Sequence, residues 1–171
     1  GYVAQQAHMC KGSIRSNICF GKPDASDEEM VHAATVAQAS DFISKREHGY
    51  LDEIAEDGTN ISGGQKQRLS IARVILKKPS LYIYDDSFSA LDFKTDATLR
   101  KALKPEVKDA IFFVVAQRIS TIMDSDMIIV LDEGQIIGMG THTQLLKDCR
   151  VYQEIAHSQL TQKELDDYER N

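Results

Sequence analysis

One short run places a hydroxyl side chain, two glycines and an amide directly before a helical pattern; it consists of Ile61, Ser62, Gly63, Gly64 and Gln65. The stretch from Gln65 to Lys77 favours a helix. Backbone N–H groups at the start of a helix lack partners within it and carry the positive end of its dipole. The two glycines let an anion approach these groups, and the serine can cap the helix or donate to a phosphate oxygen. The run therefore predicts either a phosphate-binding turn or an ordinary serine-capped helix.

Two carboxylates follow an apolar run further along the chain. Residues 81–84 read Leu-Tyr-Ile-Tyr and predict a strand that ends in Asp85 and Asp86. In an open α/β sheet, ligands gather at the carboxyl ends of the strands. Carboxylate oxygens are ligands that Mg²⁺ prefers, with waters and substrate phosphates completing the shell. We expect Asp85 to bind the metal and Asp86 to face a water that attacks a terminal phosphate; the plainer interpretation is a strand that ends in a polar turn.

The pattern around these motifs changes from helical to strand-like near Pro79. Residues 26–78 read as mainly helical, beginning with a capping box at Ser26. The helices expected here cover residues 27–39, 41–45 and 65–77, with a loop at 54–61. Beyond Pro79, compact apolar runs predict strands of a buried parallel sheet at 81–84, 111–115 and 127–131, with crossover helices at 96–103 and 120–123. A hairpin turn at 132–135 and surface helix at 143–165 complete the predicted order.

Composition is that of an ordinary soluble globular chain. The 171 residues are 42% hydrophobic and 27% charged. A chain of this length can form one large domain or two small subdomains. The formal net charge of −6 argues against a nucleic-acid surface, which is usually basic. Three cysteines show no zinc spacing, and their odd number favours free thiols in a reducing compartment. The longest apolar run, 110–116, is too short to span a bilayer, and we expect the chain itself to be soluble.

Five motifs occur in family order between residues 3 and 92, and over nearly its whole length the chain resembles the nucleotide-binding domain of an ABC transporter of the exporter type. The motifs are the glutamine loop at Val3-Ala4-Gln5, an X-loop at Glu56-Asp57-Gly58, the signature at 61–65, Walker B at Tyr82–Asp85 and the D-loop at Ser89-Ala90-Leu91-Asp92. The resemblance implies an α/β, P-loop-NTPase-like core with a mainly parallel sheet and an α-helical subdomain. Residues 1–171 would form one partial domain, with the helical subdomain and signature at 26–78. Residues 79–171 would hold Walker B, the D-loop, the switch segment and the C-terminal helices.

The same resemblance implies a mechanism and partners. Two such domains close head to tail around two ATP molecules, and each site joins one domain's Walker motifs to the other's signature. Gln5 would contact Mg²⁺ and the attacking water, Ser89 and Asp92 would act in the D-loop, and Glu56 would lie near coupling helices. The other partner is the transporter's transmembrane domain, which places the domain at the cytoplasmic face of the cell membrane. No nucleic acid and no further membrane contact are implied.

Three departures from the family pattern limit what can be expected. The Walker A loop is missing: the only Gly-Lys pair, Gly21-Lys22, is followed by Pro23, so we expect the N-terminal part of the domain to lie outside this sequence and the chain alone to be inactive. Asp86 stands where the family has a catalytic glutamate, and Gln117 where it has the switch histidine. A neutral amide cannot become cationic as histidine can. Two departures at one site, beside an intact signature, resemble the degenerate half of a bacterial heterodimeric multidrug exporter.

Two other classes of protein compete with an exporter subunit. A soluble ABC-type ATPase of the chromosome-maintenance or DNA-repair kind also carries a signature and Walker B. Such proteins insert long coiled-coil heptads between the motifs, and this chain sustains none. The remaining alternative is a regulatory nucleotide-binding module without chemistry of its own.

Overall fold

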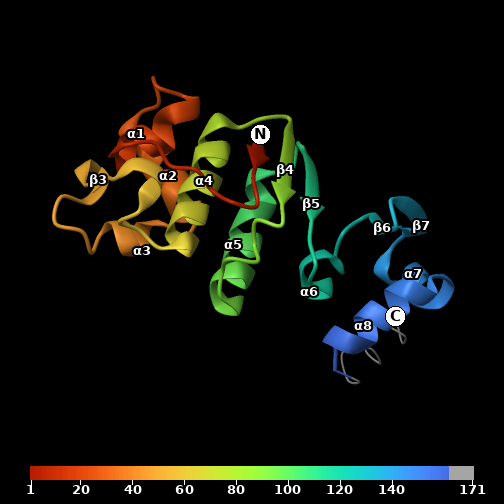
Figure 1. The fold of residues 1–171 in the computed structure, drawn as a ribbon. Helices are drawn as coiled ribbons and strands as arrows, with labels where there is room; N and C mark the ends of the chain where they lie inside the picture. The colour runs from red at the N-terminus through yellow and green to blue at the C-terminus, as the bar shows by residue number, and fades with distance from the viewer. Residues whose placement is uncertain (162–171) are drawn as a thin grey trace. The chain divides into compact units, whose positions relative to one another are not determined.

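The computed structural model describes residues 1–161 and divides the chain into two compact units, Gly1–Val115 and Ala116–Asn171 (Figure 1). Each unit is built around a core of its own. The first carries the expected parallel sheet and most of the helices, and the described part of the second, 116–161, carries a hairpin and three helices. The finer division into subdomains at 26–78 and 79–171 stays a prediction. None of the helices within residues 1–161 is both long and apolar enough to cross a bilayer.

The sheet of the first unit has three parallel strands in the order β1-β4-β5: Tyr2–Val3, Leu81–Asp85 and Ile111–Val115. Figure 1 shows the N-terminus alongside β4, where Tyr2 pairs with Ile83. The strands predicted at 81–84 and 111–115 are confirmed, and they pair in register from Leu81 opposite Ile111. The connection between them is α5, Phe93–Glu106, which is longer than the predicted 96–103 because Asp92 caps it at the start.

Short helices and one long helix make up residues 14–77: α1 (Ile14–Ile18), η1 (Cys19–Gly21), α2 (Asp27–Val36), α3 (Ser40–Ile43), η2 (Gly49–Leu51) and α4 (Gly63–Lys77). The capping box of α2 is confirmed, since Ser26 Oγ accepts from the Glu29 amide at 3.2 Å. α2 ends three residues before the predicted Ala39, because Gln38 adopts a left-handed conformation (φ 58°).

The predicted loop at 54–61 is partly regular. It holds the end of β3 (Glu53–Ile54), which pairs antiparallel with β2 (Gly12–Ser13), and the 3-10 turn η3 (Glu56–Gly58). These elements are only two or three residues long, and a two-residue strand has no periodicity to read from sequence. They fasten the segment before α4 to the segment that follows β1.

Packing in the first unit centres on α4 and the aromatic face of β4. The apolar face of α4 is fully buried at Leu69, Ile71, Ala72 and Ile75. Along β4, Tyr82 and Tyr84 point into the core, and Tyr84 stacks on Phe88 with ring centroids 5.3 Å apart. Because successive strand side chains alternate between faces, Leu81, Ile83 and Asp85 share the opposite face. The core thus fixes on which side of the sheet the acid stands.

The second unit contains α6 (Ile119–Ile122), β6 (Ile128–Asp132), β7 (Gln135–Gly140), α7 (His142–Asp148) and α8 (Arg150–Gln159). The predicted hairpin turn is confirmed, with Glu133 and Gly134 both at positive φ. β6 pairs antiparallel with β7, so the expectation that 127–131 belongs to the parallel sheet is wrong. A continuous apolar run does not reveal its partner strand. Within β6 only Ile128 and Val130 are buried, the alternation of a strand with one covered face.

The helix predicted at 143–165 is two helices within the described residues. Cys149 adopts an extended conformation (φ −119°, ψ 101°) and divides α7 from α8. Both helices bury side chains in the core of the second unit, among them Leu145, Tyr152 and Ala156. The segment therefore contributes to a core, whereas the sequence predicted a surface helix. Residues 162–165 of the predicted helix lie outside the described part of the chain.

Protonation of His142 is expected to destabilise the second unit at low pH. The side chain is 3% exposed, its Nδ1 lies 2.7 Å from the Tyr152 hydroxyl, and burial lowers its pKa below the ordinary value of 6.5. The unfolded chain therefore binds the proton more readily than the folded one. The stability contributed by neutral His142 is complete above a pH of about 6.5 and is lost as the pH falls towards the lower folded pKa.

The test measures the midpoint temperature of thermal unfolding of the chain at a series of pH values from about 8 to about 5. We expect the midpoint to fall less steeply with acidification in His142→Gln than in the wild type. The matched control is His157→Gln, which changes an exposed histidine of α8 and should follow the wild-type curve. Parallel curves for His142→Gln and the wild type would contradict the prediction.

Candidate functional site

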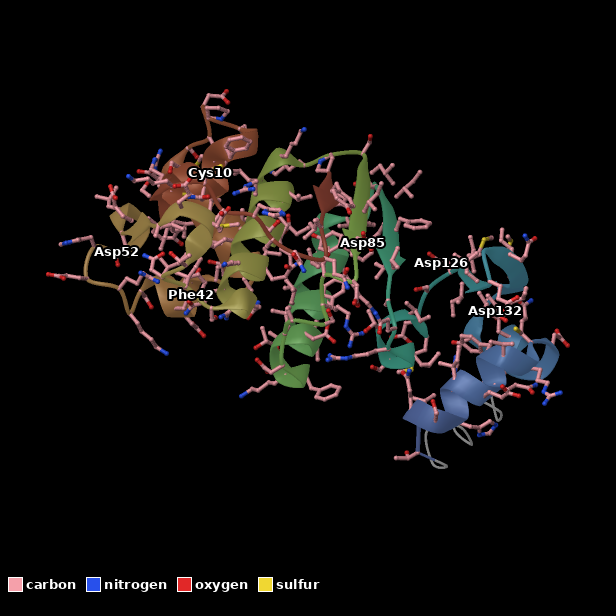
Figure 2. The ribbon with its side chains drawn as sticks, viewed as in Figure 1. Cys10, Phe42, Asp52, Asp85, Asp126 and Asp132 are labelled. Atoms are coloured by element: carbon pink, nitrogen blue, oxygen red, sulfur yellow. The ribbon has the colours of Figure 1, made fainter. Side chains whose placement is uncertain are left out.

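Two hydrogen bonds join the acidic end of β4 to the segment around β1. The Tyr2 hydroxyl donates to Asp85 Oδ2 at 2.9 Å, and Gln5 Nε2 donates to Asp86 Oδ2 at 3.3 Å. Figure 2 labels Asp85 at the end of β4. The hydrogen bond to the carboxylate raises the pKa of Tyr2. Residues about eighty positions apart in sequence thus meet at the carboxyl ends of two neighbouring strands, where ligands of open α/β sheets bind.

The chain turns sharply at Asp86. Its φ is 44°, a left-handed conformation that aspartate tolerates better than most residues. The Asp86 amide donates to the Val115 carbonyl at 2.9 Å, and its carbonyl accepts from Ser89 Oγ at 2.7 Å. Asp86 therefore leaves the alternation of β4, and its side chain reaches Gln5 while that of Asp85 reaches Tyr2.

Ser87 is a buried part of this site that sequence reasoning missed. Its side chain is inaccessible to solvent, and its Oγ lies 2.8 Å from the Val3 carbonyl and 3.2 Å from the Asp85 carbonyl. These contacts fasten the backbone after β4 to the end of β1. The available signal was a small hydroxyl residue directly after the two acids, which has no distinctive spacing. Tyr2 was missed for a similar reason, because its partner is set by strand register.

The run 61–65 forms the start of α4 as a capping box. Ser62 Oγ accepts from the Gln65 amide at 3.3 Å, and Gln65 Oε1 accepts from the Ser62 amide at 3.0 Å. The serine-capped helix is therefore confirmed, while phosphate binding stays a prediction. Ile61 is buried and anchors the approach to the helix.

The two glycines of the run lie in different surroundings. A Cβ added at Gly63 would meet no heavy atom within 4 Å, whereas one added at Gly64 would lie 3.3 Å from the Ala90 carbonyl. The run is thus close to Ala90 and Leu91 at Gly64 and open at Gly63. The open side gives an anion room to approach the free amides of the first helical turn.

The segment containing Glu56 is fastened to the same helix. Lys66 Nζ donates to the Asp57 carbonyl at 2.6 Å, and Asp57 and Gly58 both adopt positive φ. The side chain of Asn60 closes the turn by donating to the Glu53 carbonyl at 2.8 Å. Glu56 itself is exposed. The turn 56–58 is therefore hydrogen-bonded to the first part of α4 through Lys66.

Two side chains of α4 hold the segment that contains Gln5. Gln67 is 1% exposed, and its Nε2 donates to the Ala4 carbonyl at 3.1 Å. Further along α4, Arg73 Nε donates to the Asn17 carbonyl at 2.8 Å. Burial lowers the pKa of the Arg73 guanidinium. Asn17 in turn donates to the Cys10 carbonyl at 2.8 Å. The positions of Gln5 and of the run 61–65 are thus set by one helix.

Asp92 serves as the N-cap of α5. Its carboxylate accepts from the Thr95 amide at 2.9 Å and from the Thr95 hydroxyl at 2.7 Å. These two hydrogen bonds hold the pKa of the Asp92 carboxyl below its usual value. Asp92 is therefore a carboxylate at neutral pH with a local structural role, and its predicted role in a D-loop stays a prediction.

Gln117 belongs to the second unit, where its backbone is hydrogen-bonded to α8. Its carbonyl accepts from Gln159 Nε2 at 2.8 Å, and Gln159 Oε1 accepts from the Ile119 amide at 2.9 Å. The side chain of Gln159 thus joins α8 to the segment that holds the predicted switch residue. Gln117 is exposed.

The oxygen atoms gathered at the end of β4 suit a hard divalent cation. Asp85 and Asp86 supply carboxylates, and the Gln5 amide supplies a carbonyl oxygen. Within residues 1–161 no three histidine, cysteine or acidic side chains cluster as a complete metal cage would require. Mg²⁺ does not need such a cage, because it is usually held by one or two carboxylates together with waters and substrate phosphates. The donor set therefore fits Mg²⁺.

Comparison with known proteins identifies the family. A family model described as "ABC transporter" matches residues 1–89, which is 89 of the 171 residues. The chain belongs to the ABC transporter family. An uncharacterized ABC transporter ATP-binding protein of Mycobacterium tuberculosis is 43% identical over 162 residues, covering 93% of this chain and 28% of that protein. A putative multidrug export ATP-binding/permease protein of Bacillus subtilis is 46% identical over 146 residues, covering 85% and 25%.

A solved structure gives the fold of this ABC transporter domain. The structure of a bacterial Atm1-family ABC exporter with ATP bound matches with a TM-score of 0.89 and 36% identity, over 92% of this chain and 28% of that one. The predicted ABC ATPase fold is thereby confirmed. The chain spans about a quarter of the length of the curated relatives that it matches.

Proposed function

We propose that this chain is part of the ATP-binding and hydrolysing domain of an ABC exporter. The observation that carries the proposal is the meeting of Gln5, Asp85 and Asp86 at the carboxyl ends of β1 and β4. Similarity to proteins named for ATP binding and multidrug export supports the same conclusion. The names of these relatives favour an exporter subunit over a soluble ABC-type ATPase of the chromosome-maintenance or DNA-repair kind.

Each residue of this site is proposed to have its own role in phosphoryl transfer. In the proposed mechanism, Asp85 and Gln5 would hold Mg²⁺, and the ion would supply positive charge that offsets the charge of the ATP phosphates. Asp86 accepts a hydrogen bond from the attacking water and orients it towards the terminal phosphate. Gln117 donates a hydrogen bond to that phosphate. A phosphate loop is also required, and the motif for it does not occur within these 171 residues. We therefore expect the chain alone to be inactive.

The run 61–65 is proposed to act in a second ATP site. Ser62 and the amides after it would bind the terminal phosphate of ATP held by a partner domain, in a head-to-tail dimer. The open side of Gly63 supports this role, because an anion from outside can reach the start of α4. Ser89 and Asp92 would lie at the same dimer contact.

Asp86 and Gln117 are proposed to make this domain's own site slow. Aspartate is one methylene shorter than the glutamate that the family has at this position, and a displacement of about 1 Å can cost on the order of 10²-fold in rate. The partner is therefore proposed to be a non-identical subunit whose site, completed by the run 61–65, hydrolyses ATP at the normal rate.

The remaining parts of the proposal concern the whole transporter. We propose that the domain works at the cytoplasmic face of the cell membrane and contacts it through a transmembrane domain. Glu56 would receive the movement of that domain, and the Lys66–Asp57 contact offers a route from it to the run 61–65.

Replacing Asp85 by asparagine tests the metal assignment. In the full-length transporter with its partner, we expect Asp85→Asn to weaken Mg²⁺ binding at this domain's site by at least about 10-fold, since it removes the charge of the ligand. The affinity for ATP without Mg²⁺ should stay the same. Titration of a fluorescent ATP analogue with and without Mg²⁺ measures both quantities.

The matched control is Asp109→Asn, the same change at an exposed residue between α5 and β5. It should leave both affinities at the wild-type value. Retention of wild-type Mg²⁺ dependence by Asp85→Asn would overturn the assignment of Asp85.

A further inference from the structure

Tyr2 makes the single hydrogen bond to the Asp85 carboxylate within residues 1–161. The phenol oxygen lies 2.9 Å from Oδ2. The pair is set by strand register: Tyr2 stands opposite Ile83 in the parallel pairing of β1 and β4. Asp85 lies two residues beyond Ile83 on the same face, which is the diagonal distance that a long side chain can bridge.

We propose that Tyr2 is a positioning residue that holds one oxygen of the Asp85 carboxylate, so that the other oxygen is presented to the metal. This inference rests on the proposed role of Asp85 as a ligand. A carboxylate at the end of a strand can otherwise rotate about its last torsion. A donor that occupies Oδ2 fixes that rotation and leaves Oδ1 free to bind the ion.

The backbone and the side chain of Asp85 are held by different partners. Ser87 Oγ lies 3.2 Å from the Asp85 carbonyl and 2.8 Å from the Val3 carbonyl, which holds the backbone at the strand end. Tyr2 acts on the carboxylate alone. The two residues are therefore separable in experiment, because loss of the phenol hydroxyl leaves the Ser87 contacts in place.

A phenol suits this role for two reasons. It is a neutral donor at physiological pH, so it orients the carboxylate without competing with the cation for its charge. Tyr2 is 58% exposed, so its hydroxyl can be removed without opening a cavity in the core. Removing an outer-shell partner of this kind typically lowers the affinity for the metal by about 10–100-fold.

The test is Tyr2→Phe in the full-length transporter assembled with its partner. Electron paramagnetic resonance of Mn²⁺ added to the ATP-bound complex measures metal affinity directly, and Asp85→Asn identifies which class of sites belongs to this domain. We expect Tyr2→Phe to weaken Mn²⁺ binding in that class by about 10-fold or more. The affinity for ATP without metal and the unfolding midpoint should equal those of the wild type.

The matched control is Tyr50→Phe, which removes a hydroxyl from η2 and should change none of these quantities. Wild-type Mn²⁺ affinity in Tyr2→Phe, beside a loss in Asp85→Asn, would overturn the inference and leave the proposed function standing. A fall in metal-free ATP affinity or in the unfolding midpoint would assign Tyr2 a structural role and overturn it equally. No loss in Asp85→Asn would instead overturn the proposed metal site itself.

Discussion

Replacing Asp86 by glutamate together with Gln117 by histidine is expected to raise ATP turnover at this domain's own site by about 10²-fold. The longer side chain would carry the carboxylate about one C–C bond further towards the attacking water. The imidazole would supply a donor that can become cationic as negative charge develops on the terminal phosphate, which a neutral amide cannot. The expectation applies to the full-length transporter with its partner.

The backbone at position 86 accepts the larger residue. Asp86 has a φ of 44°, a conformation that costs most side chains some energy, but Glu133 adopts the same φ of 44° elsewhere in this chain. The Asp86 amide and carbonyl are held by Val115 and Ser89, and these contacts do not depend on the side chain. Glutamate at position 86 should therefore preserve the turn.

Single-turnover hydrolysis, with the partner's site inactivated, measures the effect. The matched control makes the same two chemical changes at exposed positions of the chain, Asp109→Glu and Gln135→His, and should leave the rate unchanged. A double variant at 86 and 117 whose single-turnover rate equals that of the wild type would show that these two residues do not limit hydrolysis.

Local chemistry explains which parts of the fold could be predicted. The start of α4 follows from Ser62 and Gln65, which satisfy each other's amides three residues apart. The strands β4 and β5 follow from short, continuous runs of β-branched and aromatic residues. The turn at Glu133 and Gly134 follows from Gly134, which adopts positive φ without the steric cost that a side chain adds. Each of these features depends on residues within one turn or one strand.

Contacts between distant residues could not be predicted in the same way. The placement of residues 127–131 in the parallel sheet was wrong because an apolar run specifies a buried face and not a partner strand. The bonds from Tyr2 to Asp85 and from Gln5 to Asp86 depend on the register of β1 against β4 and on the left-handed turn at Asp86. Neither the register of β1 against β4 nor the turn at Asp86 can be predicted from the two residues of β1. The resemblance to a family indicated that Gln5 and the acids act together, but not how they touch.

A methyl group at position 63 is expected to separate folding from function. Gly63→Ala should stabilise the chain by roughly 0.5–1 kcal/mol, because alanine loses less backbone entropy than glycine in a helix. The added Cβ would meet nothing within 4 Å, and Gly63 is already in the first turn of α4. Hydrolysis at the partner's site should nevertheless fall by about 10²-fold, since the methyl would displace the phosphate by about 1 Å from the helix amides.

Two measurements on the assembled transporter test this pair of opposite effects: the unfolding midpoint and single-turnover hydrolysis at the partner's site. Gly21→Ala is the matched control, because a Cβ there makes only ordinary contacts, the nearest at 3.8 Å from the Arg73 carbonyl. The control should leave hydrolysis unchanged. Gly64 is unsuitable as a control, because its Cβ would press on the Ala90 carbonyl at 3.3 Å and disturb the fold as well. If Gly63→Ala left the partner's hydrolysis at the wild-type rate, the run 61–65 would have no part in a second ATP site, and its glycines would serve the helix start alone.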